Sequence, residues 1–321
     1  MTIFSKKSVR IHQWLCVSLI MRFSLAIVLI LVANHFSVGQ TLKVMSYNLR
    51  LDTPDDGVNQ WPKRVDKVVA LITKYNPDII GVQEALHHQL QDLLKNLPDY
   101  SYCGVGRDDG KEKGEYSAIL FHNTRFGLLN TDTRWLSETE DVPGSKSWYA
   151  AITRIYTIAR FFDRNTKKEF VMANTHLDHI GKVSREISTQ LIKDYLMKMK
   201  AEALESNENS KNNIPIIISG DFNSEPTEVP YLRMLEGGIK EYIVDGARKE
   251  LTLYDSRPNG STAETYCGFK VGAMPCKTID FIFHTKEWIA RNYQVITDND
   301  GTYYPSDHLP VLVDFDLAME K

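Results

Sequence analysis

The sequence has few cysteines, no long apolar segment and no basic tract, and each of these absences excludes a class of protein. Four cysteines in 321 residues form no cysteine-rich set of the kind that holds a structural zinc. The longest uninterrupted apolar run, 23–33 (FSLAIVLILVA), has about eleven residues, whereas a membrane-spanning helix needs about 20. No GxGxxG motif follows the first expected strand, which argues against a dinucleotide-binding sheet. The remaining composition, 43% hydrophobic and 25% charged residues, is that of a globular protein.

The first 39 residues also lack acidic side chains, since the first one in the chain is Asp52. They combine a basic start, the apolar run and the small residues Ser37 and Gly39, which is the pattern of a cleaved signal peptide. We therefore expect residues 1–39 to be a signal peptide and the mature protein to be secreted or periplasmic, beginning near Gln40. Met21 could be the true start of a shorter leader. A retained membrane anchor is the alternative, and the short apolar run argues against it.

The expected leader carries four basic residues, Lys6, Lys7, Arg10 and Arg22. Because it carries no acidic residue, its removal would change the formal net charge from −3 to −7. Proteins that wrap nucleic acid usually present a basic face, because contacts with phosphates supply most of their affinity. The acidic mature chain therefore argues against broad, non-specific DNA binding, although a nuclease with a local basic rim is compatible with it.

Three cysteines, Cys103, Cys267 and Cys276, would remain after cleavage. Cys267 and Cys276 are close enough in the sequence to close a small loop in an oxidising compartment, which would leave Cys103 as a buried thiol. Three unpaired cysteines are the alternative, because spacing alone does not determine disulfide pairing.

Strands and helices are expected to alternate along residues 40–321, without a repeat, a long linker or a break in composition. Residues 64–75 show apolar side chains at helical spacing, and residues 214–219 (IPIIIS) are typical of a strand buried on both faces. The expected helices are 64–75, 85–97 and 184–204, and the expected strands are 42–47, 79–83, 117–121, 152–162, 169–175, 214–219, 279–283, 293–297 and 310–315. One domain over 40–321 is the simplest interpretation, with residues 205–213 as a polar surface loop.

Polar residues gather where the expected strands end or begin. They are Asn48, Glu84, His176, Asp178, Asp221, Asn223, Asp280, Asp307 and His308. Rigid strands hold such side chains in place, while the adjoining loops leave room for a substrate. Their oxygen and imidazole donors suit Mg²⁺, Mn²⁺ or Ca²⁺ rather than a structural zinc. The set also offers what phosphate-ester hydrolysis requires: ligands for a metal, a base for water and donors to the phosphoryl oxygens.

Taken singly, each of these residues has a structural explanation, such as a turn residue or a solvated loop acid. In chain order, however, they fall in YN, QE, NTHLD, GDFN, IDF and SDHLP, and this series resembles the endonuclease/exonuclease/phosphatase (DNase I-like) superfamily. The resemblance runs from Lys43 to Phe315. It implies an α/β (α+β) four-layer sandwich, in which two mainly antiparallel β-sheets pack face to face with helices outside.

The resemblance also implies how the motif residues divide the chemistry. Asn48 and Glu84 would hold the metal, and the cofactor would be one or two Mg²⁺ or Mn²⁺ ions. Asp307 would lie beside this metal or beside a second one. Asp221 would position or deprotonate the attacking water, and Asn223 would donate hydrogen bonds to the phosphoryl oxygens.

The remaining motif residues would bind the substrate's phosphate. His308 would contact the scissile phosphate, with Asp280 fixing its tautomer and favouring the imidazolium. His176 would be a further phosphate contact or an acid. The lesser candidates for substrate binding are Tyr116, Asp178, Arg154 and Arg185, for which a structural role is the alternative.

These expectations describe a metal-dependent hydrolase that cleaves a phosphodiester or a phosphomonoester by in-line attack of water. Its substrate would be a nucleic acid, a phospholipid or a sugar phosphate, and it would act as a monomer without a stable protein partner. A non-catalytic binding module that retains the fold is the alternative from another class. Such a module should lose the motif's Glu, Asp or His, but Glu84, Asp221 and His308 are all present. A glycoside hydrolase with paired carboxylates would leave Asn48 and Asn223 unexplained.

Overall fold

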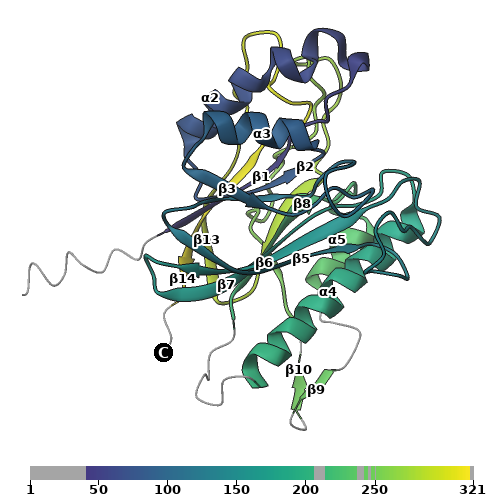
Figure 1. Ribbon diagram of the computed structural model, residues 1–321, viewed down its shortest axis with the longest axis vertical. Coiled ribbons are helices and arrows are strands. Elements are labelled where there is room, and N and C mark those ends of the chain that lie inside the picture. The colour runs from purple at the N-terminus through teal and green to yellow at the C-terminus, as the bar shows by residue number, and fades with distance from the viewer. Residues whose placement is uncertain (1–40, 206–213, 237–241, 245–246, 250, 319–321) are drawn as a thin grey trace, which may run out of the picture. The chain divides into compact units, whose positions relative to one another are not determined.

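Two six-stranded β-sheets pack face to face at the centre of the computed structural model (Figure 1). The structure describes residues 41–205, 214–236, 242–244, 247–249 and 251–318, so the expected leader and residues 206–213 of the expected surface loop lie outside the described residues. Thr41–Lys321 forms one compact unit.

Both sheets follow the same plan, with one parallel pair of strands at the centre and antiparallel pairs on either side. The first sheet has the order β13 (Trp288–Val295), β14 (Val311–Leu317), β1 (Leu42–Asn48), β2 (Ile79–Gln83), β4 (Ile119–His122), β3 (Tyr100–Cys103). The second has the order β11 (Tyr254–Asp255), β12 (Asp280–His284), β8 (Ile216–Asp221), β7 (Lys168–His176), β6 (Ile155–Asp163), β5 (Phe126–Trp135). The parallel pairs are β1 with β2 and β7 with β8. The expected pair of mainly antiparallel sheets is confirmed. A separate hairpin joins β9 (Tyr242–Val244) to β10 (Ala247–Lys249).

Helices cover the outer faces of the two sheets (Figure 1). The helices α2 (Val65–Tyr75) and α3 (His87–Asn96) share a buried apolar cluster with the first sheet, beside the short 3₁₀ helices η1 (Pro54–Asn59) and η2 (Trp61–Lys63). The helices α4 (Lys182–Glu205) and α5 (Val229–Leu235) share another cluster with the second sheet. A third apolar cluster lies between the two sheets. The layers are therefore helix, sheet, sheet and helix, as the resemblance implied.

The strand β8 shows how the sequence produces these layers. Successive side chains of a strand point to opposite faces, so a strand between two apolar layers must be apolar at every position. Ile216 and Ile218 pack in the cluster shared with the outer helices, whereas Ile217 packs in the cluster between the sheets. The uninterrupted β-branched run therefore predicted a strand that is buried on both faces.

A small polar contact replaces the apolar core between the sheets just beneath the ends of β2, β7 and β8. Asn174 accepts hydrogen bonds at Oδ1 from Gln83 Nε2 (2.7 Å) and Ser219 Oγ (3.0 Å). Its Nδ2 donates to the carbonyl oxygens of Val82 and Ala118. Gly81 lets the two backbones approach here, because a Cβ at this position would lie 2.1 Å from Ser219 Oγ. These contacts fix the position of one sheet relative to the other.

The described residues contain one disulfide and one buried free thiol. Cys267 is bonded to Cys276, and Cys103 is unpaired and buried. The sequence left open whether these cysteines pair, and the structure contains the small loop that a Cys267–Cys276 disulfide closes. Among the described helices, none combines the length and the apolar character that crossing a membrane requires.

Candidate active site

The strand order brings the polar ends of distant segments to one edge of the sandwich. Parallel neighbours end at the same edge, so Asn48 of β1 lies beside Gln83 of β2, and His176 of β7 lies beside Asp221 of β8. The antiparallel strand β12 starts where β8 ends, which pairs Asp280 with Asp221. Segments that are far apart in the sequence therefore contribute side chains to one site.

Asn48 connects the acidic residues of the two sheets. Its Nδ2 donates one hydrogen bond to Glu84 Oε1 and another to Asp221 Oδ2, each 3.0 Å long. Its Oδ1 accepts a hydrogen bond from Arg50 N. Because Asn48 is fully buried, it holds the two carboxylates at a fixed separation.

Glu84 is held from both its backbone and its side chain. Its φ of 64° lies in the left-handed region, which a non-glycine residue rarely adopts outside turns and functional sites. Leu51 N donates to Oε2 at 3.2 Å. Burial would raise the pKa of Glu84, but His308, Asn48 and Arg50 together lower it, so the carboxylate is ionised at neutral pH.

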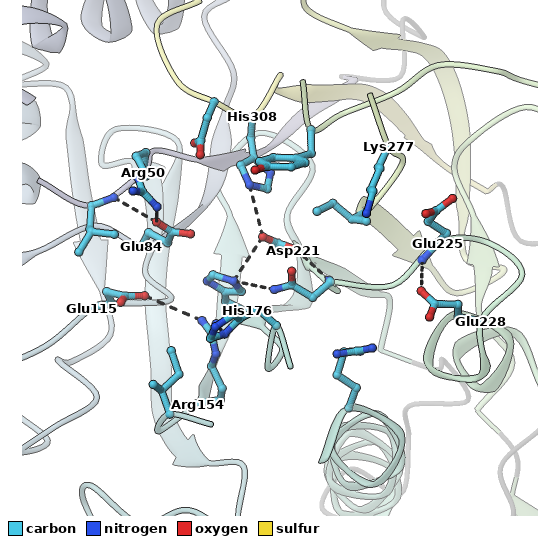
Figure 2. Close-up of a pocket in the computed structure, with 18 of the residues that line it drawn as sticks. Arg50, Glu84, Glu115, Arg154, His176, Asp221, Glu225, Glu228, Lys277 and His308 are labelled. Carbon is cyan, nitrogen blue, oxygen red and sulfur yellow. Dashed lines mark hydrogen bonds and ion pairs between the residues drawn. The ribbon is translucent and has the colours of Figure 1, made fainter. Parts of the chain in front are cut away.

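His308 lies above Asp221 (Figure 2), and a second carboxylate, that of Asp280, orients it. Its Nδ1 donates to Asp280 Oδ2 at 2.9 Å, and its Nε2 lies 3.7 Å from Asp221 Oδ2. Burial would lower the pKa of His308, but the charges of Asp280 and Asp221 raise it well above its usual value. The side chain is therefore an imidazolium, which can donate a hydrogen bond and neutralise negative charge.

Asp221 is completely buried beside other acids. Burial, followed by the charge of Asp280, raises its pKa to about 7, against the opposing effect of His308. A carboxyl group with such a pKa can accept and release a proton near neutral pH. Asn223 N donates to its Oδ1 at 2.9 Å, which fixes the carboxylate in the turn that follows β8.

His176 is a neutral imidazole on the opposite side of Asp221. Asn223 Nδ2 donates to its Nε2 at 3.0 Å, and Asp221 Oδ2 lies 3.3 Å from the same nitrogen. Burial, and then the charge of Arg154, lower the pKa of His176 well below 6.5. The neutral form favours a hydrogen-bonding role over that of an acid.

The donor set of this site fits a hard divalent cation. Ligand atoms of Glu84, Asp221 and His308 all lie within 4.8 Å of one another. The imidazolium of His308 has no free lone pair, so the carboxylates are the better ligands. Burial raises the pKa values of Asp221 and Asp307, and the negative charge of Glu84 raises both further. A bound cation would balance that charge, and oxygen ligands are those that Mg²⁺ and Mn²⁺ prefer.

The catalytic candidates open into a pocket of about 680 Å³. Of the residues that the sequence indicated, the lining contains Glu84, Arg154, His176, Arg185, Asp221, Asn223, Asp307 and His308. Asn48 and Asp280 lie directly behind this lining and act through the residues that they hold. The main candidates are thus brought together, and their individual roles stay predictions.

Two of the four lesser candidates do not line the pocket. Tyr116 is buried, and its hydroxyl donates to the Lys111 carbonyl oxygen at 2.8 Å. Asp178 is also buried, and its carboxylate accepts hydrogen bonds from backbone N–H groups, including those of Gly181 and Ala151. Both side chains organise loops. The structural alternative is therefore the better interpretation of each.

Several lining residues were not indicated by the motifs. They are Arg50, Glu115, His179, Glu225, Thr227, Glu228, Tyr266 and Lys277. Glu115 precedes Tyr116, and in an extended segment neighbouring side chains point to opposite sides. That alternation makes Glu115 the other candidate at this position, but it does not tell which of the two side chains faces the pocket. Tyr266 and Lys277 flank the Cys267–Cys276 loop, whose place ahead of Asp280 was visible in the sequence.

Comparison with known proteins finds similar sequences and similar folds. The sequence model described as "Endonuclease/Exonuclease/phosphatase family" matches residues 45–308. A Bacteroides vulgatus protein described as an endonuclease/exonuclease/phosphatase is 31% identical, with a TM-score of 0.75 over 87% of this chain and 100% of that one. A mannosyl-6-phosphatase from Bacteroides thetaiotaomicron is 32% identical, with a TM-score of 0.71 over 85% and 99%.

Curated relatives are more distant and longer. A probable RNA exonuclease from Saccharomyces cerevisiae is 26% identical over 63% of this chain and 42% of its own length. The chain spans between 47% and 66% of the length of two other curated relatives that it matches.

Proposed function

Since the chain belongs to the endonuclease/exonuclease/phosphatase family, we propose that it is a phosphoesterase that depends on a divalent cation. The reaction is the hydrolysis of a phosphate ester by in-line attack of water. The observation that carries this proposal is the convergence of Glu84, Asp221 and His308, from three distant segments, in one buried cluster beneath a pocket.

The cation would be held by Glu84, with Asp307 and Asn48 beside it, and it would be Mg²⁺ or Mn²⁺. When bound, it would neutralise the negative charge that develops on the phosphoryl group. Against the effect of burial, His308 and Asn48 lower the pKa of Glu84, as does Arg50, which lies 3.9 Å from Glu84 Oε2. The polar contact between the sheets beneath it limits the movement of the end of β2.

The chain's own residues then divide the work around the phosphate. Asp221 orients the attacking water and takes its proton, a role that suits a carboxyl group with a pKa of about 7. His308, held by Asp280, donates a hydrogen bond to a phosphoryl oxygen, and its positive charge stabilises the negative charge there. Asn223 and His176 lie on the opposite side of Asp221. Asn223 Nδ2 donates to His176 Nε2 and to the Leu177 carbonyl oxygen, so its proposed hydrogen bond to a phosphoryl oxygen would replace one of these two.

We further propose that the protein is exported after cleavage of residues 1–39 and acts as a monomer. The Cys267–Cys276 disulfide supports export, because disulfides persist in oxidising compartments. The basic, apolar and then small-residue pattern before Gln40 supports it independently. N-terminal sequencing of the exported protein tests this proposal. A mature chain that begins before Phe36 would contradict it.

The activity is tested with para-nitrophenyl phosphate and bis(para-nitrophenyl) phosphate as mono- and diester reporters. EDTA should abolish hydrolysis, and Mg²⁺ or Mn²⁺ should restore it. Glu84→Gln should raise the metal concentration needed for half-maximal rate, whereas Glu264→Gln, an exposed acid outside the pocket, should not. Hydrolysis that resists the chelator would contradict the proposed mechanism. Absence of any metal-supported hydrolysis would favour the non-catalytic binding module.

A further inference from the structure

The active-site pocket continues beyond Asp221 to a rim of mixed charge, which the reaction itself does not use. We propose that this rim binds the hydroxyl groups of a small sugar or polyol, so that the substrate is a sugar phosphate or polyol phosphate, and that Glu225, Glu228 and Lys277 determine this specificity. This inference rests on the proposed phosphoesterase function and names the substrate class of the same site.

The position of the rim is set by two short segments. Figure 2 shows Lys277, Glu225 and Glu228 on the side of Asp221 that lies away from Glu84. Glu225 and Glu228 follow Asn223 in the loop before α5, and Glu228 Oε2 accepts a hydrogen bond from Glu225 N at 2.8 Å. A phosphate held at Asp221 and His308 would therefore direct its alcohol portion either toward this rim or out of the pocket.

Lys277 is positioned by the loop that the disulfide closes. Tyr266 and Lys277 are linked by backbone hydrogen bonds in both directions, each 2.9 Å long, and Cys267 and Cys276 lie directly inside this pair. The same strand-like segment holds Tyr266 against His308, with 4.8 Å between the ring centroids. The covalent loop therefore presents a lysine and an aromatic ring to the pocket from a fixed backbone.

The chemistry of these side chains matches a molecule that carries several hydroxyl groups. Each ionised carboxylate accepts O–H donors at two oxygens, and an ammonium group donates to hydroxyl oxygens in return. The ring of Tyr266 is half-buried and offers an apolar face beside them. The pocket volume of about 680 Å³ lies within the range of about 300–1,000 Å³ that is typical of sites for small molecules.

The same rim disfavours a polynucleotide. A strand that left the site over Glu225 and Glu228 would bring its phosphates next to two carboxylates. Lys277 is the exposed cation beside them, whereas Arg185 is buried and donates to Ser224 Oγ and to the Asp178 carbonyl oxygen. Nucleic-acid grooves instead follow the backbone with several basic side chains. The net charge of −7 expected for the mature chain acts in the same direction.

The proposed reaction is a hydrolysis with simple balance. A bond forms between the phosphorus and the water oxygen, and the bond between the phosphorus and the sugar oxygen breaks. One proton of the water passes by way of Asp221, and the departing alkoxide gains a proton, so the products are inorganic phosphate and the free sugar.

The test measures kcat/KM of the protein from Gln40 to Lys321, with Mn²⁺ present, on four substrates. They are a hexose 6-phosphate, glycerol phosphate, para-nitrophenyl phosphate and a single-stranded RNA oligonucleotide. We expect kcat/KM for the hexose phosphate to exceed that for the aromatic reporter. The ratio of the two efficiencies should fall at least about tenfold in Glu225→Gln, Glu228→Gln and Lys277→Ala, the effect of losing one hydrogen bond to a charged group. Glu264→Gln and Lys270→Ala, exposed residues outside the pocket, are the matched controls and should keep the wild-type ratio.

The outcomes separate the two proposals. The specificity would be overturned if the protein hydrolysed para-nitrophenyl phosphate as efficiently as the sugar phosphate. It would also be overturned if the three rim variants left the ratio of the two kcat/KM values unchanged. Either result would leave the phosphoesterase function intact. Preferred cleavage of the oligonucleotide would do the same. Absence of metal-dependent hydrolysis of every ester would overturn the phosphoesterase function, and the specificity with it.

Discussion

Gly81→Ala should destabilise the protein and reduce its activity, because the glycine lies at the closest approach of the two sheets. A Cβ at this position would lie 2.1 Å from Ser219 Oγ and 2.6 Å from Asn174 Oδ1, which are both inside van der Waals contact. Asn174 and Ser219 are fully buried and hydrogen-bonded, so neither side chain can move away without losing a partner.

The expected loss of stability follows from the contacts that must change. Forcing a methyl group into a packed interior costs about 1–3 kcal/mol. The displacement would also break one or two hydrogen bonds of Asn174, each contributing about 0.5–1.5 kcal/mol. The free energy of unfolding should therefore fall by about 2–5 kcal/mol. Glu84 follows this strand directly, so a displacement of β2 by about 1 Å should also lower kcat by about a hundredfold.

Urea unfolding and steady-state kinetics measure the two effects. Gly127→Ala is the matched control, since Gly127 also lies in a strand and the atom nearest to its Cβ would be Arg164 Nη2, at 3.4 Å. Ser219→Ala removes the Oγ atom nearest to the new methyl group. Gly81→Ala should therefore lower the free energy of unfolding by less in the Ser219→Ala variant than in the wild type, which gives a measurable coupling energy between the two positions. A Gly81→Ala protein within about 0.5 kcal/mol of the wild type would refute the close packing of the sheets at this point.

Further predictions concern residues at increasing distance from the chemistry. Asp280→Asn removes the charge that raises the pKa of His308, so kcat should fall by about 10²–10⁴-fold at pH 7 while urea unfolding still shows a cooperative transition; an unchanged kcat would exclude the pair from the mechanism. Burial raises the pKa of the Cys103 thiol to about 12, so at pH 8 iodoacetamide should alkylate it far more slowly in the native protein than in urea, and equal rates would contradict its burial. Replacing Cys267 and Cys276 together by serine should lower the free energy of unfolding by about 2–3 kcal/mol, because the disulfide closes a loop of about ten residues; an unchanged midpoint in urea would show that the loop is held without it.

The sequence predicted the parts of the fold whose burial pattern is strong. Strands β2 and β8 are buried along their length and begin with runs of isoleucine, and their bounds were predicted to within two residues. Strand β5 was not predicted, because Phe126–Trp135 is an edge strand whose middle is exposed and carries no apolar alternation. Strand β3 was too short, at four residues, to give a pattern.

The site shows a similar division between motifs and loops. Glu84, Asp221 and His308 could be identified because each belongs to a motif that adjoins a strand, and the central parallel pairs bring those strand ends together. The rim residues could not be identified from the sequence, because Glu225 and Lys277 lie on loops whose positions depend on tertiary contacts. The same applies to Glu115, because spacing alone does not tell whether Glu115 or Tyr116 faces the pocket from this irregular segment.

The account depends most on Asp221 and His308 acting as one unit on the same phosphate. Its most direct test is to measure kcat for para-nitrophenyl phosphate at saturating Mn²⁺ in Asp221→Asn, His308→Ala and the double variant, with folding checked by urea unfolding. Each single change should lower kcat by several orders of magnitude, and the double variant should be little worse than the poorer single one. If the losses in kcat of the two single variants multiplied in the double variant, the two residues would act independently, and the account would be contradicted. A wild-type kcat in either single variant would also contradict it.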